Sequence, residues 1–289
     1  MDVRQSKFWQ VYLEKLGWKK FSIGKNSAYV RKIPFGAIVK IPRVDQTIGF
    51  KEIDDLAVAE KAFLVKMEPN IVSEDKKFIQ TLLANGYTGD NWSLQPTKTI
   101  QVDLEVSEET LLKNMEKDTR YSVHRSERES VVVEKSEDID AFLKLHKETS
   151  KRQNFWVSTE DSKSLWNSLP KENRSILFAK KGPEVLAGAF LIFYDSIAYY
   201  YEAGSTKKGR RLLAPYLVVW ESLKLAKEKN CKRFDFEGVV DPRIKATKKW
   251  EGFTHFKKGF GGNEVRYLGS FVKYYNPIVK LVFSLNKFF

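Results

Sequence analysis

The sequence repeats one order of expected elements twice, and this repeat limits the possible folds more than any other feature. Each copy contains an amphipathic helical pattern, a β-hairpin pattern, a second helix and a short β-rich run. The ranges are 8–18, 29–42, 52–60 and 62–67 in the first copy, and 138–152, 176–194, 213–229 and 233–236 in the second. Two copies of one α/β unit therefore fit the chain better than one unbroken domain.

Each copy resembles the N-acyltransferase fold, in which a mixed, mostly antiparallel sheet carries helices on both faces. We expect an α/β (α+β) protein with one such unit at residues 1–134 and another at 135–269. The apolar segment 270–289, with Lys273, Lys280 and Lys287 seven residues apart, predicts an amphipathic helix that packs back on the first unit. Contact of this helix with a membrane surface is the alternative.

Cysteine and histidine usage argues against a disulfide framework and a local metal site. The 289 residues include one cysteine, Cys231, and three histidines, His124, His146 and His255, that lie far apart in the sequence. Cys231 borders a predicted buried strand, which favours an inert core thiol, and His146 lies on the apolar face of its helix. No run reaches the roughly 18 apolar residues of a membrane helix, and the first ten residues contain no apolar signal core. We expect a cytoplasmic, metal-free protein.

The net charge of +13 is unevenly distributed. Residues 201–270 contain sixteen basic and eight acidic residues, so +8 of the excess lies in a quarter of the chain. Such a field attracts polyanions: nucleic acid, phosphorylated metabolites or anionic lipid head groups. Lysine-rich helix faces of an ordinary soluble protein explain the same composition equally well.

Several familiar catalytic motifs are missing from the sequence. It has no phosphate-loop motif, no G-x-S-x-G nucleophile elbow, no dinucleotide fingerprint and no evident carboxylate pair. A coenzyme A site should show a glycine-rich turn that opens a helix. The corresponding segment, 207–215 (KKGRRLLAP), has one glycine, bulky leucines and a proline. This segment disfavours coenzyme A and suits a basic groove for a larger polyanion.

A set of stretches through most of the chain resembles the FemABX family. They are FWQVYLEKLGW (8–18), KMEP (66–69), the block at 97–133, KETSKRQNF (147–155), YYYEAGST (199–206), the block at 212–239 and GFTHFKKGFGG (252–262). Two departures concern acceptor recognition. The family's Gly-Pro after the arginine of the first hairpin is replaced here, since Ile41-Pro42-Arg43 continues into Val44-Asp45, and the long helical arm of some members is missing.

The resemblance implies an aminoacyltransferase with no cofactor. Family members transfer an amino acid from aminoacyl-tRNA to the side-chain amine of a peptidoglycan stem peptide, on a UDP-linked or lipid-linked precursor, and so build the interpeptide bridge. The partners implied are aminoacyl-tRNA and the precursor, with peripheral contact at the cytoplasmic membrane as a further possibility. Because the donor is an activated ester, the enzyme has to position an amine and stabilise an oxyanion.

The same resemblance implies a set of site residues. The family's Phe-Lys pair matches Phe256-Lys257, and Lys257 is expected near the developing oxyanion or the departing ribose oxygen. The other candidates are Lys40, Arg43, Arg152, Tyr199 and Tyr201 for substrate, and Lys207, Lys208, Arg210, Arg211, Lys245, Lys248 and Lys249 for the tRNA acceptor stem. Strand alternation places Tyr199 and Tyr201 on one face and Tyr200 on the other, so at least one of the three belongs to the core.

Two other functions remain open at this point. An N-acyltransferase with a different acyl donor is one, although the segment at 207–215 argues against it. A non-catalytic protein of the same fold that binds tRNA or an envelope component is the other, and it predicts that Lys257→Ala leaves function and binding largely intact.

Overall fold

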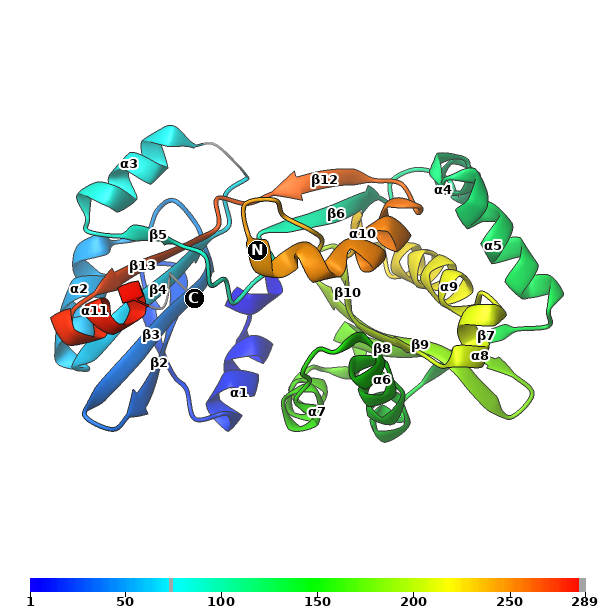
Figure 1. Cartoon of the computed structure of the whole chain (residues 1–289), viewed down its shortest axis with the longest axis horizontal. Coiled ribbons are helices and arrows are strands. Elements are labelled where there is room, and N and C mark those ends of the chain that lie inside the picture. Colours follow the sequence, from blue (N-terminus) through cyan, green and yellow to red (C-terminus); the bar gives the residue numbers. More distant parts are fainter. Residues whose placement is uncertain (73–74, 286–289) are drawn as a thin grey trace. The chain divides into compact units, whose positions relative to one another are not determined.

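The computed structural model describes residues 1–72 and 75–285. The chain forms two compact units, each with its own sheet and apolar core (Figure 1). The first unit contains Met1–Lys98, Asp241–Lys245 and the segment from Arg266 onward. The second contains Thr99–Val240 and Ala246–Val265.

This division differs from the expected boundary at residue 134, because residues 99–134 belong to the second unit. Their strand β6 (Lys98–Asp103) pairs with β11 (Arg233–Asp235), a strand more than 130 positions later in the chain. Val102, Leu111 and Val123 contribute to the apolar core of the second unit. Chain order alone does not reveal such a long-range pairing, so the repeat pattern placed these residues with the preceding copy.

The first unit has a six-stranded sheet with strand order β1-β2-β3-β4-β13-β5. The described pairs are antiparallel except β3 with β4, which is parallel. The strands are β1 (Lys19–Ile23), β2 (Asn26–Ile33), β3 (Gly36–Val44), β4 (Ala62–Pro69), β5 (Thr88–Asp90) and β13 (Ser270–Tyr274). The helical segments are η1 (Val3–Gln5), α1 (Lys7–Lys15), α2 (Phe50–Ala59), α3 (Lys76–Ala84) and α11 (Pro277–Leu285).

The second unit has a seven-stranded sheet with strand order β12-β6-β11-β10-β9-β8-β7. Its remaining strands are β7 (Val132–Ser136), β8 (Arg174–Lys181), β9 (Glu184–Tyr194), β10 (Ile197–Ser205) and β12 (Asn263–Arg266). Its helical segments include α4 (Glu108–Asn114), α5 (Lys117–Arg128), α6 (Ile139–Gln153), α7 (Thr159–Ser168), η2 (Lys171–Asn173), α8 (Lys207–Arg211), α9 (Ala214–Glu228) and α10 (Glu251–Lys258), while η3 (Lys245–Trp250) crosses the unit boundary.

Residue alternation along β9 separates two apolar layers in the second unit. Ala189 and Leu191 face the core that also contains residues of α5 and α9. Phe190 faces the other side, where its ring packs against Phe142 of α6 and Trp166 of α7. The sheet therefore lies between helices on both faces, as the α/β fold class predicts.

The C-terminal segment differs in part from the expected helix at 270–289. Residues 270–274 form β13, which lies between β4 and β5, and only Pro277–Leu285 is helical. Ser270, Phe271 and Val272 are buried, which suits an interior strand with neighbours on both sides. Residues 286–289 of the expected helix lie outside the described residues. Within the described ranges, no helix has both the length and the apolar character to cross a membrane.

A glycine fixes the position of α8 on the sheet. A Cβ atom at Gly209 would overlap the backbone carbonyl of Leu186 in β9. We expect Gly209→Ala to lower the free energy of unfolding by about 1–3 kcal/mol, because backbone must shift to accept the methyl group. Urea unfolding measures this change.

Gly252 in α10 is the matched control, because nothing lies within 4 Å of a Cβ built there. Gly252→Ala should leave stability unchanged or raise it by up to about 1 kcal/mol through helix propensity. Equal stability of the two variants would contradict the close packing of α8 on β9.

Candidate functional site

Each unit contains one parallel strand pair among the described pairs, and this pair is longer in the first unit than in the second. In the first unit β3 pairs with β4 from Ala37 to Val44. In the second, β10 pairs with β11 only through Ile197, Ala198 and Tyr199. Residues 200–205 of β10 continue beside β9 without β11 as a partner. Beyond the pair Tyr199–Asp235, groups from outside the sheet reach β10: the amide of Ser205 donates a hydrogen bond to Oγ1 of Thr149 in α6 at 2.8 Å, and its carbonyl oxygen accepts one from Arg152 at 2.8 Å.

A β-bulge lies directly beyond this point. Tyr200 pairs with Leu191 and Glu202 with Phe190, so Tyr201 is the extra residue. The ring of Tyr201 packs against Phe190, with 5.6 Å between the ring centroids. Glu202 turns to the same layer, where it accepts a hydrogen bond from Ser162 of α7 at 2.7 Å. Two consecutive side chains thus face one side of the sheet, which regular alternation does not allow.

Lys257 of α10 lies at the end of β11. Its Nζ donates a hydrogen bond to the carbonyl oxygen of Gly238 at 2.7 Å, three residues after the strand ends. Thr254, one turn earlier, accepts a hydrogen bond from the amide of Val240 at 2.9 Å. These two bonds connect α10 to the loop that follows β11.

The environment of Lys257 lowers the pKa of its ammonium to about 8. Burial is the largest cause, and the negative charges of Glu237 and Asp235 partly offset it. Asp235 is itself buried and accepts hydrogen bonds from Thr99 and Gln101. A partly desolvated ammonium of this kind can interact strongly with a developing oxyanion.

Phe256, the other half of the predicted Phe-Lys pair, faces the apolar core. Its ring packs edge-on against Tyr216 and Phe260, with centroids 4.9 and 5.3 Å away. These contacts fix the orientation of α10, so Phe256 is placed to position Lys257.

The three consecutive tyrosines of β10 have different environments. Tyr200 is buried in the α9-side core against Phe234 and Phe236, and burial raises the pKa of its hydroxyl. Tyr199 is also buried, whereas Tyr201 is partly exposed. The core role expected for one of the three belongs to Tyr200.

Two arginines meet at the far end of β10. Arg152 of α6 donates a hydrogen bond to the carbonyl oxygen of Ser205 at 2.8 Å, and Arg210 of α8 approaches the same oxygen at 3.4 Å. Burial and then the charge of Arg210 lower the pKa of Arg152. Two guanidinium groups at one carbonyl form a concentration of positive charge suited to a phosphate group.

Lys40 and Arg43 lie in the first unit and differ in their burial and in their contacts. The Lys40 ammonium lies 3.9 Å from the centroid of the Trp18 ring and is partly exposed. Arg43 is buried, donates to the carbonyl of Pro96 at 2.7 Å, and stacks 3.8 Å from the Tyr267 ring centroid. These internal contacts give Arg43 a structural role within its unit.

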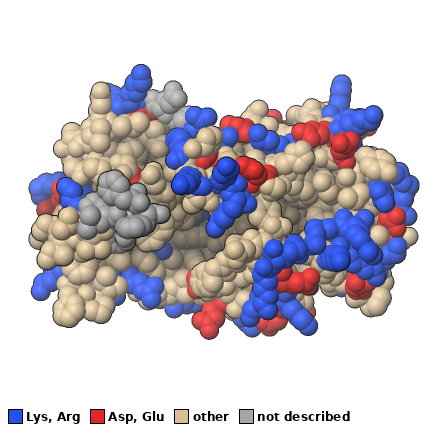
Figure 2. All heavy atoms as spheres, viewed as in Figure 1, with Lys and Arg blue, Asp and Glu red and all other residues tan. Residues whose placement is uncertain are grey.

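The predicted tRNA-binding residues fall into two groups. Lys207, Lys208, Arg210 and Arg211 are brought together on α8, where Lys208 forms an ion pair with Glu184. Lys245, Lys248 and Lys249 are exposed on η3. Lysine and arginine side chains gather over α6 and α8 on the face shown in Figure 2.

The structure adds a polar pair that the sequence pattern did not reveal. His146 of α6, expected in the core, is 5% exposed, and its Nδ1 lies 3.4 Å from Oε2 of Glu202. The one sequence signal for this pair was a glutamate in the middle of an otherwise apolar strand.

Cys231 is buried as expected, and burial raises the pKa of its thiol to about 11. Among the described residues, no three His, Cys, Asp or Glu side chains could together hold a metal ion.

Solved structures share this two-unit fold. A crystal structure of FemX has a TM-score of 0.83 over 97% of this chain and 94% of its own, at 19% sequence identity. The C-terminal domain of a putative lysylphosphatidylglycerol synthetase from Agrobacterium fabrum has a TM-score of 0.60 at 13% identity, covering 93% of this chain and 88% of its own. At these identities the similarity establishes the fold, a protein of two α/β units of the kind found in FemX.

The chain belongs to the FemAB family, whose family model matches residues 46–162 and 163–287. Curated relatives are similar over a shorter region. Aminoacyltransferase FemA of Staphylococcus epidermidis is 27% identical over 103 residues, and that of Staphylococcus aureus (strain MW2) is 32% identical over 102 residues. The alignments cover 36% and 35% of this chain, but only 24% and 23% of the relatives' length.

The lowered pKa of Lys257 predicts a specific pH dependence of stability. The folded protein releases this proton near pH 8, whereas the unfolded chain holds it to about its ordinary pKa of 10.5. Between these values the unfolded state binds more protons, so the contribution of Lys257 to the free energy of unfolding rises with pH. The wild-type protein should gain stability relative to Lys257→Met over this window, by at most about 1.4 kcal/mol per pH unit.

Chemical denaturation at pH 7 to 10.5 measures this difference. Lys258→Met is the control, because Lys258 is exposed and forms an ion pair with Glu264 at 2.9 Å. A constant difference between the wild-type protein and Lys257→Met across the range would contradict the buried environment of the ammonium.

Proposed function

We propose that this protein is an aminoacyltransferase that moves an amino acid from aminoacyl-tRNA to the side-chain amine of a peptidoglycan stem peptide, thereby building an interpeptide bridge. The acceptor is the precursor in its UDP-linked or lipid-linked form. Membership of the FemAB family and similarity to relatives named aminoacyltransferase FemA support this activity.

The observation that carries the proposal is the early end of the β10–β11 pair next to Lys257. Where β11 stops, β10 continues beside β9 alone, with a bulge at Tyr201. Lys257 donates a hydrogen bond to Gly238 in the loop after β11. An ester carbonyl held beside this loop would have the Lys257 ammonium as a nearby hydrogen-bond donor, and acyl transfer requires such a donor to stabilise the oxyanion.

The chemistry needs no covalent enzyme intermediate. The acceptor amine, once deprotonated, attacks the ester carbonyl carbon, and a new C–N bond forms. The tetrahedral oxyanion collapses, the C–O bond to the ribose breaks, and the ribose oxygen leaves with the second amine proton. We assign Lys257 the role of stabilising the oxyanion or the departing ribose oxygen, with Phe256 and Thr254 holding α10 in place.

We assign the phosphates of the acceptor to Arg152, with Arg210 beside it, and keep Lys40 of the first unit as a separate candidate for substrate binding. A phosphate bound between these two guanidinium groups would offset their mutual repulsion and accept charge-assisted hydrogen bonds from both. Tyr199 and Tyr201 are the proposed aromatic contacts with substrate. The hydrogen bonds and stacking of Arg43 support a structural role instead, so we leave it out of the binding set.

We assign the donor tRNA to the basic surface of α8 and η3. Lys207 and Arg211 are exposed on α8, and Lys248 and Lys249 on η3. Phosphate contacts of this kind give affinity without sequence specificity.

We also propose a cytoplasmic location, with peripheral membrane contact when the acceptor is lipid-linked. Helix α11 exposes Ile278, Leu281 and Val282, which could enter the interfacial layer of a membrane.

The decisive experiment is transfer of a radiolabelled amino acid from bulk aminoacyl-tRNA to the purified UDP-linked and lipid-linked precursors. We expect Lys257→Ala to lower kcat/KM by about 10²- to 10³-fold, the usual cost of losing one oxyanion donor. Lys258→Ala, the adjacent exposed lysine, should stay within about threefold of the wild-type protein.

Absence of transfer to either precursor from a full set of charged tRNAs would exclude the proposed activity. A Lys257→Ala variant as active as Lys258→Ala would remove Lys257 from the chemistry. Transfer from an acyl-coenzyme A donor would instead support the N-acyltransferase alternative.

Arg152→Ala should raise the KM for the UDP-linked acceptor about tenfold with little change in kcat, because a charge-assisted contact to phosphate acts on binding. Steady-state kinetics at saturating aminoacyl-tRNA measure this. Arg128→Ala, at an exposed arginine of α5, is the control. An unchanged KM would place the acceptor phosphates elsewhere.

A further inference from the structure

A large aromatic side chain projects into solvent from the loop between α6 and α7. Trp156 is 83% exposed, more than Tyr121 at 55% or Val132 at 64% in the same unit. Exposure of an indole to this degree leaves a large apolar area in contact with water. None of the roles assigned above uses this side chain.

The loop around Trp156 is anchored at both ends. The amide of Phe155 donates to the carbonyl of Ser150 at 3.1 Å, and its ring packs against His146 and Phe253 at centroid distances of 5.9 and 6.3 Å. Ser158 caps α7 through a hydrogen bond from the amide of Asp161. Phe155 therefore points into the unit, and its neighbour Trp156 is held outward.

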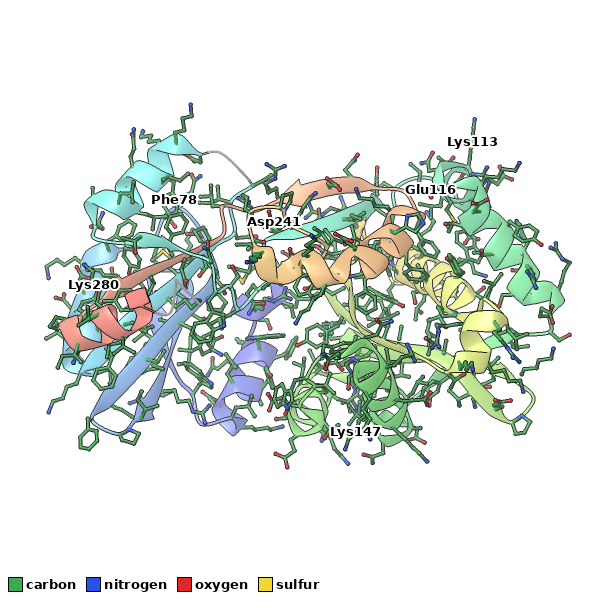
Figure 3. All side chains as sticks on the ribbon, viewed as in Figure 1. Phe78, Lys113, Glu116, Lys147, Asp241 and Lys280 are labelled. Atoms are coloured by element: carbon green, nitrogen blue, oxygen red, sulfur yellow. The ribbon has the colours of Figure 1, made fainter. Side chains whose placement is uncertain are left out.

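The exposed face of α6 leads to Trp156 and is basic. Lys144, Lys147 and Lys151 lie at positions i, i+3 and i+7, so they share one face of the helix, and all three are exposed. Figure 3 labels Lys147 on this helix, and Figure 2 shows the basic surface over it. The exposed acid Glu148 lies beside them.

These three lysines differ from many other cations of the second unit, because they form no ion pair with any described residue. Lys135, Lys163 and Lys180, by contrast, pair with Glu228, Asp140 and Glu134. Cations without local partners retain their full attraction for a polyanion.

We propose that Trp156 with Lys144, Lys147 and Lys151, here called the α6 platform, binds a single-stranded RNA end, with one base stacked on the indole. Single-stranded nucleic acids are held by the same combination of an aromatic face and a basic track. This inference rests on the proposed function, since the amino acid of an aminoacyl-tRNA is attached to a single-stranded 3′ end.

A membrane surface fits these observations less well. The apolar face of α6, with Phe142, Leu143 and Leu145, is buried within the unit. One indole is the only large apolar group that the platform offers among the described residues, whereas interfacial helices insert a continuous apolar face. Stacking, in contrast, requires only one ring.

The test is fluorescence anisotropy with a labelled twelve-nucleotide single-stranded RNA ending in CCA, and with a blunt RNA duplex of the same length. Trp156→Ala should weaken binding of the single strand about 5- to 100-fold, as expected for loss of one stacked base. Trp156→Phe should stay within about threefold of the wild-type protein, because it keeps a ring. Binding of the blunt duplex should not change.

The controls use the same unit. Tyr121→Ala removes an exposed ring that lies beneath Arg128 on α5, and it should leave binding of the single strand unchanged. Replacing Lys144, Lys147 and Lys151 together by Gln should make the slope of log K against log salt concentration shallower by about 2, the value for three phosphate contacts with a single strand. The same change at Lys135, Lys163 and Lys180, which form ion pairs, should leave the salt dependence of binding unchanged.

Three results would overturn the inference: no binding of the single strand by the wild-type protein, equal affinity of Trp156→Ala and the wild-type protein, or equal losses on single strand and duplex. Loss of sedimentation with phosphatidylglycerol vesicles in Trp156→Ala, with RNA binding intact, would assign the platform to lipid. Binding is measured without transfer, so an inactive but RNA-binding protein would contradict the proposed function and leave the platform supported.

Discussion

The site depends on the point at which two parallel strands stop pairing. After Tyr199 and Asp235, β10 loses β11 as a neighbour, and the bulge at Tyr201 follows at once. A central strand would normally satisfy its backbone groups on both sides. Here β11 is not the partner over residues 200–205, where side chains of α6 bond the backbone of Ser205 instead, and α10 is fastened to the loop after β11 by hydrogen bonds from Lys257 and Val240. The first unit extends the equivalent β3–β4 pair to Val44.

Sequence periodicity predicted most of the helices and strands of the two units, and the structure confirms these. The hairpin β2–β3, the strand β4 and the long helices α6 and α9 lie within a few residues of the expected ranges, because local patterns and turn residues specify them. Family membership and the fold class also follow from the sequence. The division at residue 134 failed because β6 joins the second sheet through a pairing that no local pattern encodes.

Side-chain roles were harder to predict than elements. Alternation predicted that at least one of the three tyrosines of β10 belongs to the core but not which one, and the structure places Tyr200 there. A bulge changes which residues share a face, so alternation could not place Glu202 beside His146. Basic residues presented a similar difficulty. Arg43 and Lys66 contribute to the positive charge of the sequence, yet both are buried and engaged within the first unit, where Lys66 pairs with Asp90. Net charge therefore overstates the number of cations available to a polyanion.

The position of β13 has a consequence for the order in which this protein can fold during synthesis. This strand lies between β4 and β5, about two hundred residues after them in the sequence, so the first sheet lacks an interior strand until the whole second unit has been synthesised. Thr99–Val240 emerges earlier and contains most of the second unit. The N-terminal part of the chain must then wait, with β4 unpaired along one edge, for the C-terminal strand. Chaperone binding to nascent chains should therefore concentrate on residues 1–98, the N-terminal segment of the first unit.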